Sequence, residues 1–243
     1  MAKILDVKID ELDFRQVMRK ITDFCVGKSL RQIVTVNPEF IMAAQKDLEF
    51  KKILNSADLS VPDGFGLKIG AAISGQKIGE RITGVDLTWE ICKLASERGF
   101  SVFFLGGKEG VAKKTAERVR DLYDRIKISG FYAGSPDDKK TLDIIKAAKP
   151  DILFVAFGAP KQDKFIYQLK SSNLKPLTLR LAIGVGGTFD YISGSIIRAP
   201  KWMRTLGLEW LYRLIRQPKR LGRIFTAVVI FPLLVVWDRI RNG

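Results

Sequence analysis

The chain has 243 residues, 47% of them apolar and 28% charged, so it can form one large α/β domain with an appendage and is too apolar to be disordered. It contains no histidine, which excludes Ser-His and Cys-His nucleophile pairs and histidine metal sites; a general base must be a carboxylate, lysine or tyrosine. The formal net charge of +15 predicts an anionic partner, and two widely separated cysteines, Cys25 and Cys92, are typical of reduced thiols in a cytosolic protein.

Short apolar runs alternate with amphipathic segments as far as about Gly194. This alternation predicts βαβ units and hence an α/β fold, a Rossmann-like, mostly parallel sheet flanked by helices. We expect an α/β catalytic domain over residues 1–196 and a basic, amphipathic, helical C-terminal appendage that binds membranes over residues 197–243. The predicted strands are Lys3–Ile9, Arg31–Asn37, Ala57–Val61, Ser101–Gly106, Ile126–Tyr132, Asp151–Phe157 and Leu177–Val185, and the predicted helices are Phe14–Val26, Val85–Arg98, Gly110–Tyr123 and Lys139–Ala148.

Polar side chains follow two of the early strands. Thr35 and Asn37 end the strand of "TVNPEF", where Asn37 and Pro38 together are typical of a helix start. Asp63 in "VPDGFG" follows the next strand and has two interpretations. It is either a turn former or helix cap, or, because the chain lacks histidine, the general base of an active site.

Glycine-rich loops end three strands, in "FLGGKEG", "VAFGAPKQ" and "IGVGGTFD". Their glycines Gly106, Gly158 and Gly186 favour the approach of a phosphate to backbone N–H groups, but each loop is equally typical of a tight turn between strand and helix. None has the G-x-G-x-x-G or P-loop spacing, so the nucleotide signal is weak.

Two further polar groups precede or begin helices. Arg81 in "GERITGVD" can hold an anion or pair with a nearby acid such as Asp86, and Gln162 lies in the first turn of a helix opened by Pro160, where its amide can meet a sugar hydroxyl. No D-x-D pair is present to clamp a metal-bound nucleotide, so we expect neither a divalent cation nor any other cofactor.

The C-terminal segment carries the strongest charge. Residues 198–243 contain ten Lys and Arg against Glu209 and Asp238, a net charge of +8. The uncharged run Ile224–Trp237 has 14 residues, fewer than the roughly 20 that span a bilayer, and Pro232 interrupts it. The preceding arginines, Arg213, Arg216, Arg220 and Arg223, are spaced to share one helical face. This pattern favours a helix lying on the membrane surface, and the alternative is a buried core helix.

The motifs "T-x-N-P", "PDG", "ER-x-x-G-x-D", "G-x-P-x-Q", "GVGG-x-FD" and "RAP-x-W…GLEW-x-YR", in this order, resemble the WecG/TagA/CpsF glycosyltransferases, glycosyltransferase family 26. The similarity runs from about Val34 to Arg223. It implies inverting transfer of an N-acetylhexosamine, N-acetylmannosamine or its uronic acid, from a UDP-sugar to N-acetylglucosamine on a polyprenyl diphosphate, in the synthesis of a cell-surface polymer such as teichoic acid. Asp163 departs from the glutamate expected after Gln162.

The resemblance also assigns roles to residues. Asp63 matches the proposed catalytic base, and the appendage arginines match residues thought to meet the acceptor diphosphate. The arginines that match the diphosphate-binding residues are Arg213, Arg220 and Arg223. The residues that match the substrate pocket are Thr35, Asn37, Arg81 and Gln162.

Three functions remain open from the sequence. The first is the lipid-acceptor glycosyltransferase, a peripheral protein at the cytoplasmic face of the membrane. The others are a nucleotide-dependent oxidoreductase and a non-catalytic protein that binds membrane surfaces. Nucleic acid is not an expected partner, because no recognition motif or stacking platform accompanies the charge. The oligomeric state is left open, a homo-oligomer included.

Overall fold

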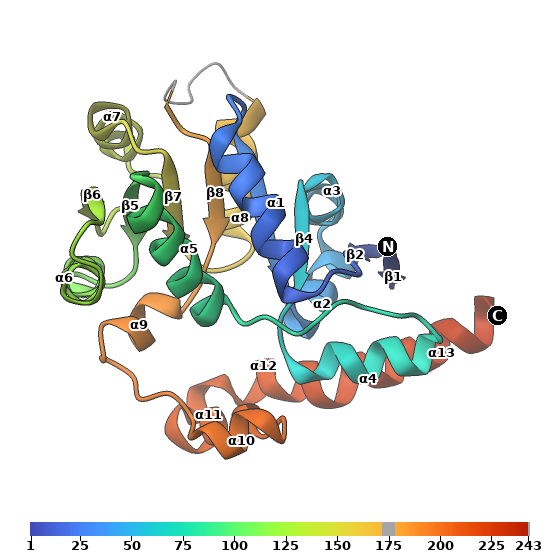
Figure 1. Cartoon of the computed structure of the whole chain (residues 1–243). Helices are drawn as coiled ribbons and strands as arrows, with labels where there is room; N and C mark the ends of the chain where they lie inside the picture. Colours follow the sequence, from blue (N-terminus) through green and yellow to red (C-terminus); the bar gives the residue numbers. More distant parts are fainter. Residues whose placement is uncertain (172–177, 243) are drawn as a thin grey trace.

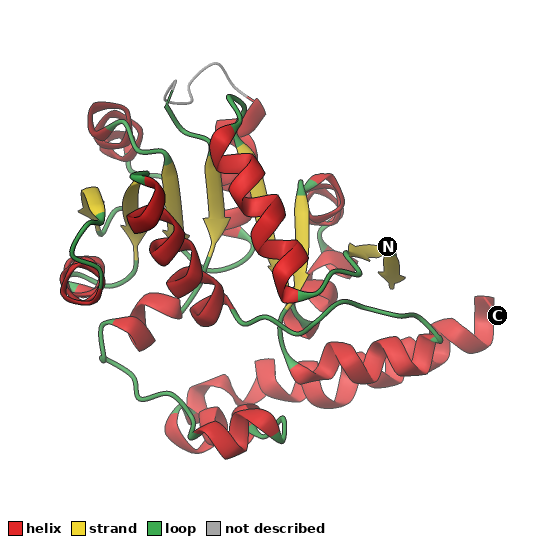
Figure 2. Cartoon of the chain, in the orientation of Figure 1, coloured by secondary structure: helices red, strands yellow, loops and turns green. Residues whose placement is uncertain are grey.

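The computed structural model describes residues 1–171 and 178–242, which form a six-stranded parallel sheet with helices on both faces (Figures 1 and 2). The strand order is β4-β3-β8-β7-β5-β6, which confirms the predicted fold class. The strands are β3 (Arg31–Val36), β4 (Leu59–Pro62), β5 (Ser101–Gly106), β6 (Lys127–Tyr132), β7 (Ile152–Ala156) and β8 (Leu181–Gly184). The helices up to β8 are α1 (Phe14–Val26), α2 (Pro38–Lys46), α3 (Leu48–Ser56), α4 (Phe65–Ser74), α5 (Gly84–Arg98), α6 (Val111–Leu122), α7 (Lys139–Ala148) and α8 (Lys161–Ser171).

The predicted first strand, Lys3–Ile9, is instead a two-stranded antiparallel hairpin, β1 (Ala2–Ile4) and β2 (Val7–Ile9). Leu5 and Asp6 turn the chain with φ of 48° and 62°, the left-handed pair that a two-residue hairpin loop requires. The alternation of the sequence did not reveal this turn, because neither residue is a glycine or asparagine. The first residue of the predicted strand Leu177–Val185 lies outside the described residues.

Local sequence signals explain where the main helices begin and end. Asp13 and Gln16 form a reciprocal capping box at the start of α1, and Asn37 caps α2 through a 3.0 Å bond from the Phe40 N–H to its Oδ1. Gly99 ends α5 in the left-handed conformation that favours glycine. The predicted spans of α1 and α7 are confirmed; that of α5 differs by one residue at its start, and that of α6 by one residue at each end.

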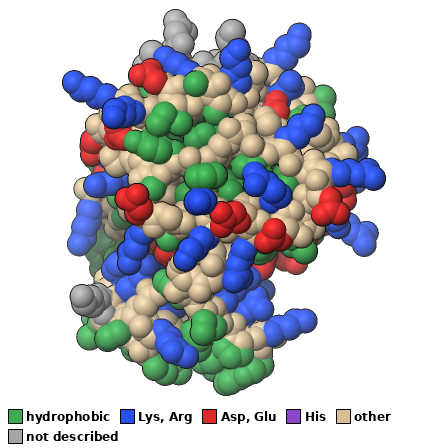
Figure 3. All heavy atoms as spheres, turned by 90° about the vertical axis from the view of Figure 1, so that its left-hand side faces the viewer, with side chains coloured by type: hydrophobic (Ala, Val, Ile, Leu, Met, Phe, Trp, Pro, Cys, Tyr) green, Lys and Arg blue, Asp and Glu red, His purple; other side chains and the backbone are tan. Residues whose placement is uncertain are grey.

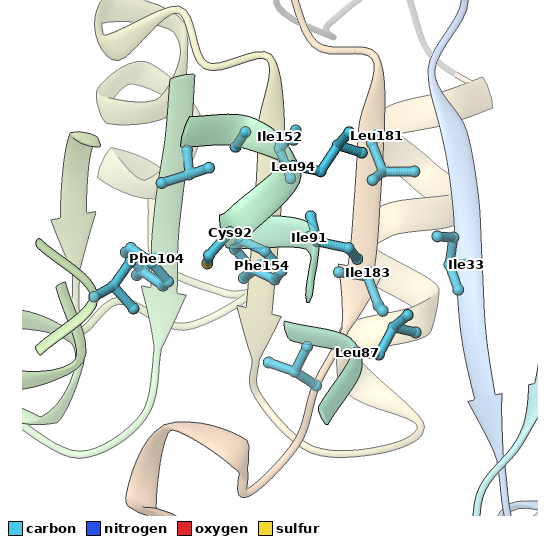
Figure 4. Packing of buried hydrophobic residues seen from close by; sticks show 14 of the residues in the cluster. Ile33, Leu87, Ile91, Cys92, Leu94, Phe104, Ile152, Phe154, Leu181 and Ile183 are labelled. Atoms are coloured by element: carbon cyan, nitrogen blue, oxygen red, sulfur yellow. The ribbon is translucent and has the colours of Figure 1, made fainter. Parts of the chain in front are cut away.

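The sheet separates clusters of buried apolar side chains. On one face, α5 packs Leu87, Ile91 and Cys92 against sheet residues such as Phe154 and Ile183 (Figure 4). A second cluster is formed by the hairpin, β3, α2, α3 and α4, and it includes two residues from the far end of the chain, Phe231 and Val235. The C-terminal segment therefore completes part of the core.

After β8 the chain forms a series of helices beneath the carboxyl edge of the sheet (Figure 1). The last of them runs from Leu221 to Arg241 without a break, through Pro232. The turn just before this proline is a π-helix, whose wider spacing relieves the clash between a proline ring and the preceding carbonyl groups. The elements are α9 (Thr188–Ile192), α10 (Lys201–Thr205), α11 (Glu209–Arg216), η1 (Pro218–Arg220), α12 (Leu221–Phe225), η2 (Thr226–Ile230) and α13 (Phe231–Asn242).

The prediction that Pro232 interrupts this segment was therefore wrong. The helix has 21 residues, and an 18-residue stretch of it has a mean hydropathy of 1.8, so its length and composition alone would allow it to cross a bilayer. One face packs on α4, where Ile224, Phe231 and Val235 are buried. The opposite face is apolar and exposed, as at Leu233 and Trp237. The helix is thus partly buried: one face packs against the core and the other is exposed.

Candidate active site

A cavity lies at the carboxyl edge of the sheet, between the strand ends and the C-terminal helices. Loops after four strands line it: the one after β3 contributes Asn37, the one after β4 Asp63, the one after β7 Gly158 and the one after β8 Gly186. The neighbouring strands β3 and β8 come from distant parts of the chain, so their loops diverge and leave a crevice, as is usual at the ligand site of open α/β sheets.

Asp63 lies where β4 ends, partly exposed in the cavity. Its backbone N–H continues the sheet by donating to the Val36 carbonyl at 2.7 Å, which fixes the direction of the side chain. Its Oδ2 faces the N–H of Gly84 at 3.5 Å. Burial raises the pKa of Asp63 to about 6; the Arg213 guanidinium opposes this rise and the Glu209 carboxylate adds to it. A carboxylate with such a pKa can accept a proton near neutral pH.

Arg213 connects the C-terminal helices to Asp63. Its guanidinium forms an ion pair with Glu209 one turn earlier in α11, and its carbon lies 5.4 Å from the centre of the Tyr191 ring. Both Arg213 and Glu209 line the cavity. The pair places one positive and one negative charge beside the carboxylate, so α11 belongs to the site rather than to a detached appendage.

Gln162 joins two of the glycine loops. It is buried, and its Oε1 accepts hydrogen bonds from the N–H groups of Gly158 at 3.1 Å and Gly186 at 2.9 Å. The side-chain oxygen is therefore engaged by the protein, and the residue fixes the spacing of the two loops. Both glycines line the cavity with positive φ, 78° and 52°.

Thr35 and Asn37 lie on the wall after β3. The Thr35 hydroxyl is buried and points to the Gly184 carbonyl at 3.5 Å. Asn37 both caps α2 and lines the cavity, so its capping role is confirmed and its role in binding stays a prediction.

Two predicted residues lie elsewhere. Arg81 is not on the wall of this cavity; it lines a second one next to Asp63 and donates to the Arg204 carbonyl at 3.1 Å. Gly106 lines neither of these two cavities in the described part of the chain. A Cβ there would lie 2.8 Å from the Phe157 ring, and its φ is 94°, so glycine is required by the turn itself.

Arg220 and Arg223 reach the cavity from η1 and α12, whereas Arg216 does not line it and lies over the Tyr212 ring, 5.6 Å from its centre. The four arginines do not share one continuous helical face, because α11 ends at Arg216 and the chain turns at Gln217. Arg223 forms an ion pair with Glu39 in the first turn of α2.

Comparison with known proteins agrees with this arrangement. A model of the glycosyl transferase WecG/TagA/CpsF family matches residues 2–243. The chain belongs to this family. It is 37% identical over 195 residues to the N-acetylglucosaminyldiphosphoundecaprenol N-acetyl-beta-D-mannosaminyltransferase of Bacillus subtilis (strain 168), covering 80% of this chain and 75% of the relative. The enzyme of the same name from Bacillus spizizenii is 36% identical over 195 residues, with 80% and 74% covered.

Membership makes the WecG/TagA/CpsF chain a glycosyltransferase, so the oxidoreductase alternative is dropped. The cavity contains what sugar transfer requires of a protein: a carboxylate with a raised pKa, guanidinium groups for anionic oxygens, and backbone loops held at a fixed spacing.

Sequence reasoning also missed the charged residues Glu39, Asp190, Arg198 and Glu209, which line this cavity with several uncharged ones. Arg198 reaches back to the start of α5, where its guanidinium binds Asp86 and the Thr83 hydroxyl. The signal that could have found Glu209 is the "GLEW" motif, in which an acid stands four residues before Arg213 on a helix, at ion-pair spacing.

Asp163, the departure from the family pattern, lies behind Gln162 rather than in the cavity. It is fully buried, and neither carboxylate oxygen has a hydrogen-bond partner among the described residues. Burial raises its pKa to about 7. Burial without a well-formed hydrogen bond is unfavourable for the ionised form, although the Gln162 side chain and the backbone N–H of Asp163 partly oppose the rise in its pKa.

Proposed function

We propose that this chain transfers an N-acetylhexosamine, N-acetylmannosamine or its uronic acid, from a UDP-sugar to N-acetylglucosamine linked through a diphosphate to a polyprenyl lipid. The product serves a cell-surface polymer such as teichoic acid. The observation that carries this proposal is the pairing of Asp63 with Arg213 and Glu209 in one cavity at the edge of the sheet. The Bacillus relatives are N-acetylmannosaminyltransferases that act on N-acetylglucosaminyldiphosphoundecaprenol, which supports the same transferred sugar and acceptor.

The chemistry needs one base. Asp63 takes the proton of an acceptor hydroxyl while the hydroxyl oxygen bonds to the anomeric carbon. The bond from that carbon to the UDP oxygen breaks on the opposite side, so the configuration inverts and UDP leaves as an anion. Arg213, Arg220 and Arg223 supply positive charge to the diphosphate groups, and the loops of Gly158 and Gly186 offer backbone to the donor.

The membrane is the second partner. The exposed apolar side chains of the C-terminal helices gather at the lower end of the molecule, with basic residues around them (Figure 3). This composition supports a peripheral helix that lies at the cytoplasmic face of the membrane, where the acceptor lipid is present. Residues 197–243 act there as a membrane-binding appendage whose arginines also complete the active-site cavity formed by residues 1–196.

The test is release of UDP on mixing the protein with UDP-N-acetylmannosamine and a short-chain diphosphate-lipid acceptor. We expect release that depends on the acceptor and persists in EDTA, because no group of three or more acidic or cysteine side chains that could hold a metal occurs in the described residues. UDP-N-acetylglucosamine is the control donor. Absence of acceptor-dependent release with both UDP-N-acetylmannosamine and its uronic acid would contradict the transferase proposal, and a non-catalytic membrane-binding protein would take its place.

A further inference from the structure

A second cavity opens beside the first and shares part of its wall. Asn37, Asp63, Glu209 and Arg213 line both, so the two spaces meet at the proposed base. Away from Asp63 the second cavity becomes a groove between α4 and the C-terminal helix. We call it the α4 groove; its apolar walls are Phe65, Ile69, Trp210, Ile224, Ala227, Val228 and Pro232.

The two ends of the α4 groove differ in character. The inner end contains the guanidinium groups of Arg81 and Arg213 next to Asp63. At the outer end, Ile69 of α4 is 42% exposed and Val228 is 37% exposed, and Val228 belongs to the exposed apolar surface of the C-terminal helices that is proposed to face the membrane. The groove thus leads from a charged end, where Arg81 and Arg213 lie among the carboxylates of Glu39, Asp63 and Glu209, along apolar walls to exposed apolar side chains.

This gradient matches one kind of ligand. A diphosphate with an apolar tail would place its anionic groups at the arginines and its first carbon atoms against the apolar walls, where burial from water is favourable. A free nucleotide or soluble sugar has no part that fits the outer end. We therefore propose that the α4 groove binds the isoprenoid units nearest the diphosphate of the acceptor lipid. The protein then recognises the lipid tail as well as the head group.

This inference rests on the proposed function for the identity of the acceptor, but its test does not need turnover. The probe is farnesyl diphosphate, which carries an isoprenoid tail, compared with inorganic diphosphate, which has none. Calorimetry should show that the parent protein binds farnesyl diphosphate about tenfold or more tightly, because several apolar carbons leave water. Val228→Gln should abolish most of that difference and leave the affinity for inorganic diphosphate unchanged.

The chain offers a matched control. Val229 follows Val228 on the same helix, is 38% exposed, and does not line the α4 groove. Val229→Gln should keep the preference for farnesyl diphosphate. Ile69→Gln, on the facing helix α4, should repeat the loss seen for Val228→Gln, which separates a groove effect from a local change in the C-terminal helix.

Equal affinity of the parent for the two probes overturns the proposal, as does a preference that survives both Val228→Gln and Ile69→Gln. The isoprenoid tail would then bind outside the α4 groove or make no specific contact with the protein. Failure of the proposed function is distinguishable from either result, because it appears as absence of acceptor-dependent UDP release while binding of farnesyl diphosphate is measured separately.

Discussion

The carboxyl edge of the sheet and the C-terminal helices face the same cavity but are built on different principles. At the sheet edge, Gln162 ties two glycine loops together, and Asp63 is fixed by a backbone bond to β3. The C-terminal side reaches the cavity through long arginine side chains, one of which, Arg223, is largely exposed and forms an ion pair with Glu39. Exposed ion pairs contribute little to stability, so this side can rearrange at small cost.

The difference suggests a division of labour. A rigid edge suits the donor, whose anomeric carbon must be held in line with the attacking oxygen. An adaptable cationic side suits an acceptor that arrives from a bilayer with its diphosphate in variable orientation. The C-terminal helix is nonetheless anchored, since Phe231 is buried in the core and Arg239 donates to the Ile73 carbonyl of α4.

The largest effect is expected at the rigid edge. Asp63→Asn keeps the size of the side chain and removes its basicity, so turnover should fall on the order of 10²-fold or more while binding of UDP is retained. In the parent, activity should decrease as the pH falls through about 6, because the base becomes protonated. Steady-state kinetics across pH tests both statements. Near-normal turnover of the variant would remove Asp63 from the role of base.

A smaller effect is expected on the adaptable side. Replacing Arg213, Arg220 or Arg223 by lysine keeps the charge that attracts anionic lipid but loses the planar fork that binds two phosphate oxygens. Turnover with the lipid acceptor should fall about tenfold, a loss typical of one charge-assisted contact, while liposome binding stays nearly unchanged.

Arg216→Lys is the matched control for this series, because Arg216 lies on the same helix as Arg213 but does not line the cavity. It should behave like the parent in both measurements. If all four variants match the parent, on vesicles and in detergent alike, the arginines serve only as a membrane anchor, and the diphosphate site lies elsewhere.

The two sides also differ in how far they could be predicted from sequence. The six strands of the parallel sheet, and the position of Asp63 at the end of one of them, could be predicted. Apolar runs that end in Pro, Gly or Asp indicate a parallel sheet and its loops. The position of the C-terminal helix could not, because its contacts with α4 join residues more than 150 apart in the chain, such as Arg239 and Ile73. Pro232 was misleading, since the π-helical turn that accommodates it has no sequence signature.

Some contacts within the site likewise could not be predicted from the sequence. Gln162 was predicted to meet a sugar hydroxyl, and only the structure reveals that its Oε1 is occupied by two backbone N–H groups. Gly106 and Gly158 follow strands in similar patterns, yet only Gly158 lines the cavity, because the order of the strands decides which loops meet.

Glu209 connects the two sides electrostatically and allows a finer test. Its carboxylate raises the pKa of Asp63 and holds the Arg213 guanidinium, which lowers that pKa. Glu209→Gln removes the first influence and releases Arg213 toward Asp63, so the acid limb of the activity profile should move to lower pH. A role in folding alone would reduce turnover without moving the limb. Glu39→Gln, which removes another acid of the same cavity, should leave the limb in place.

The smallest effect concerns stability at the rigid edge. Asp163 is buried without hydrogen-bond partners for its carboxylate, and its pKa is raised from 3.8 to about 7. Between these values the unfolded chain loses the proton that the folded chain keeps, so the folded state loses stability as the pH rises through this range.

Asp163→Asn removes this ionisation and should raise Tm by a few degrees at pH 8 relative to the parent, with a smaller difference at pH 5. Asp58→Asn is the control of opposite sign, because Lys170 and Arg31 lower the pKa of Asp58 and its charge stabilises the fold above that pKa. That variant should melt below the parent at pH 8. Calorimetric scans at the two pH values measure both changes. A difference for Asp163→Asn that does not grow with pH would mean that Asp163 finds a bonding partner when it ionises, and that the aspartate is as well accommodated here as the glutamate of the family pattern.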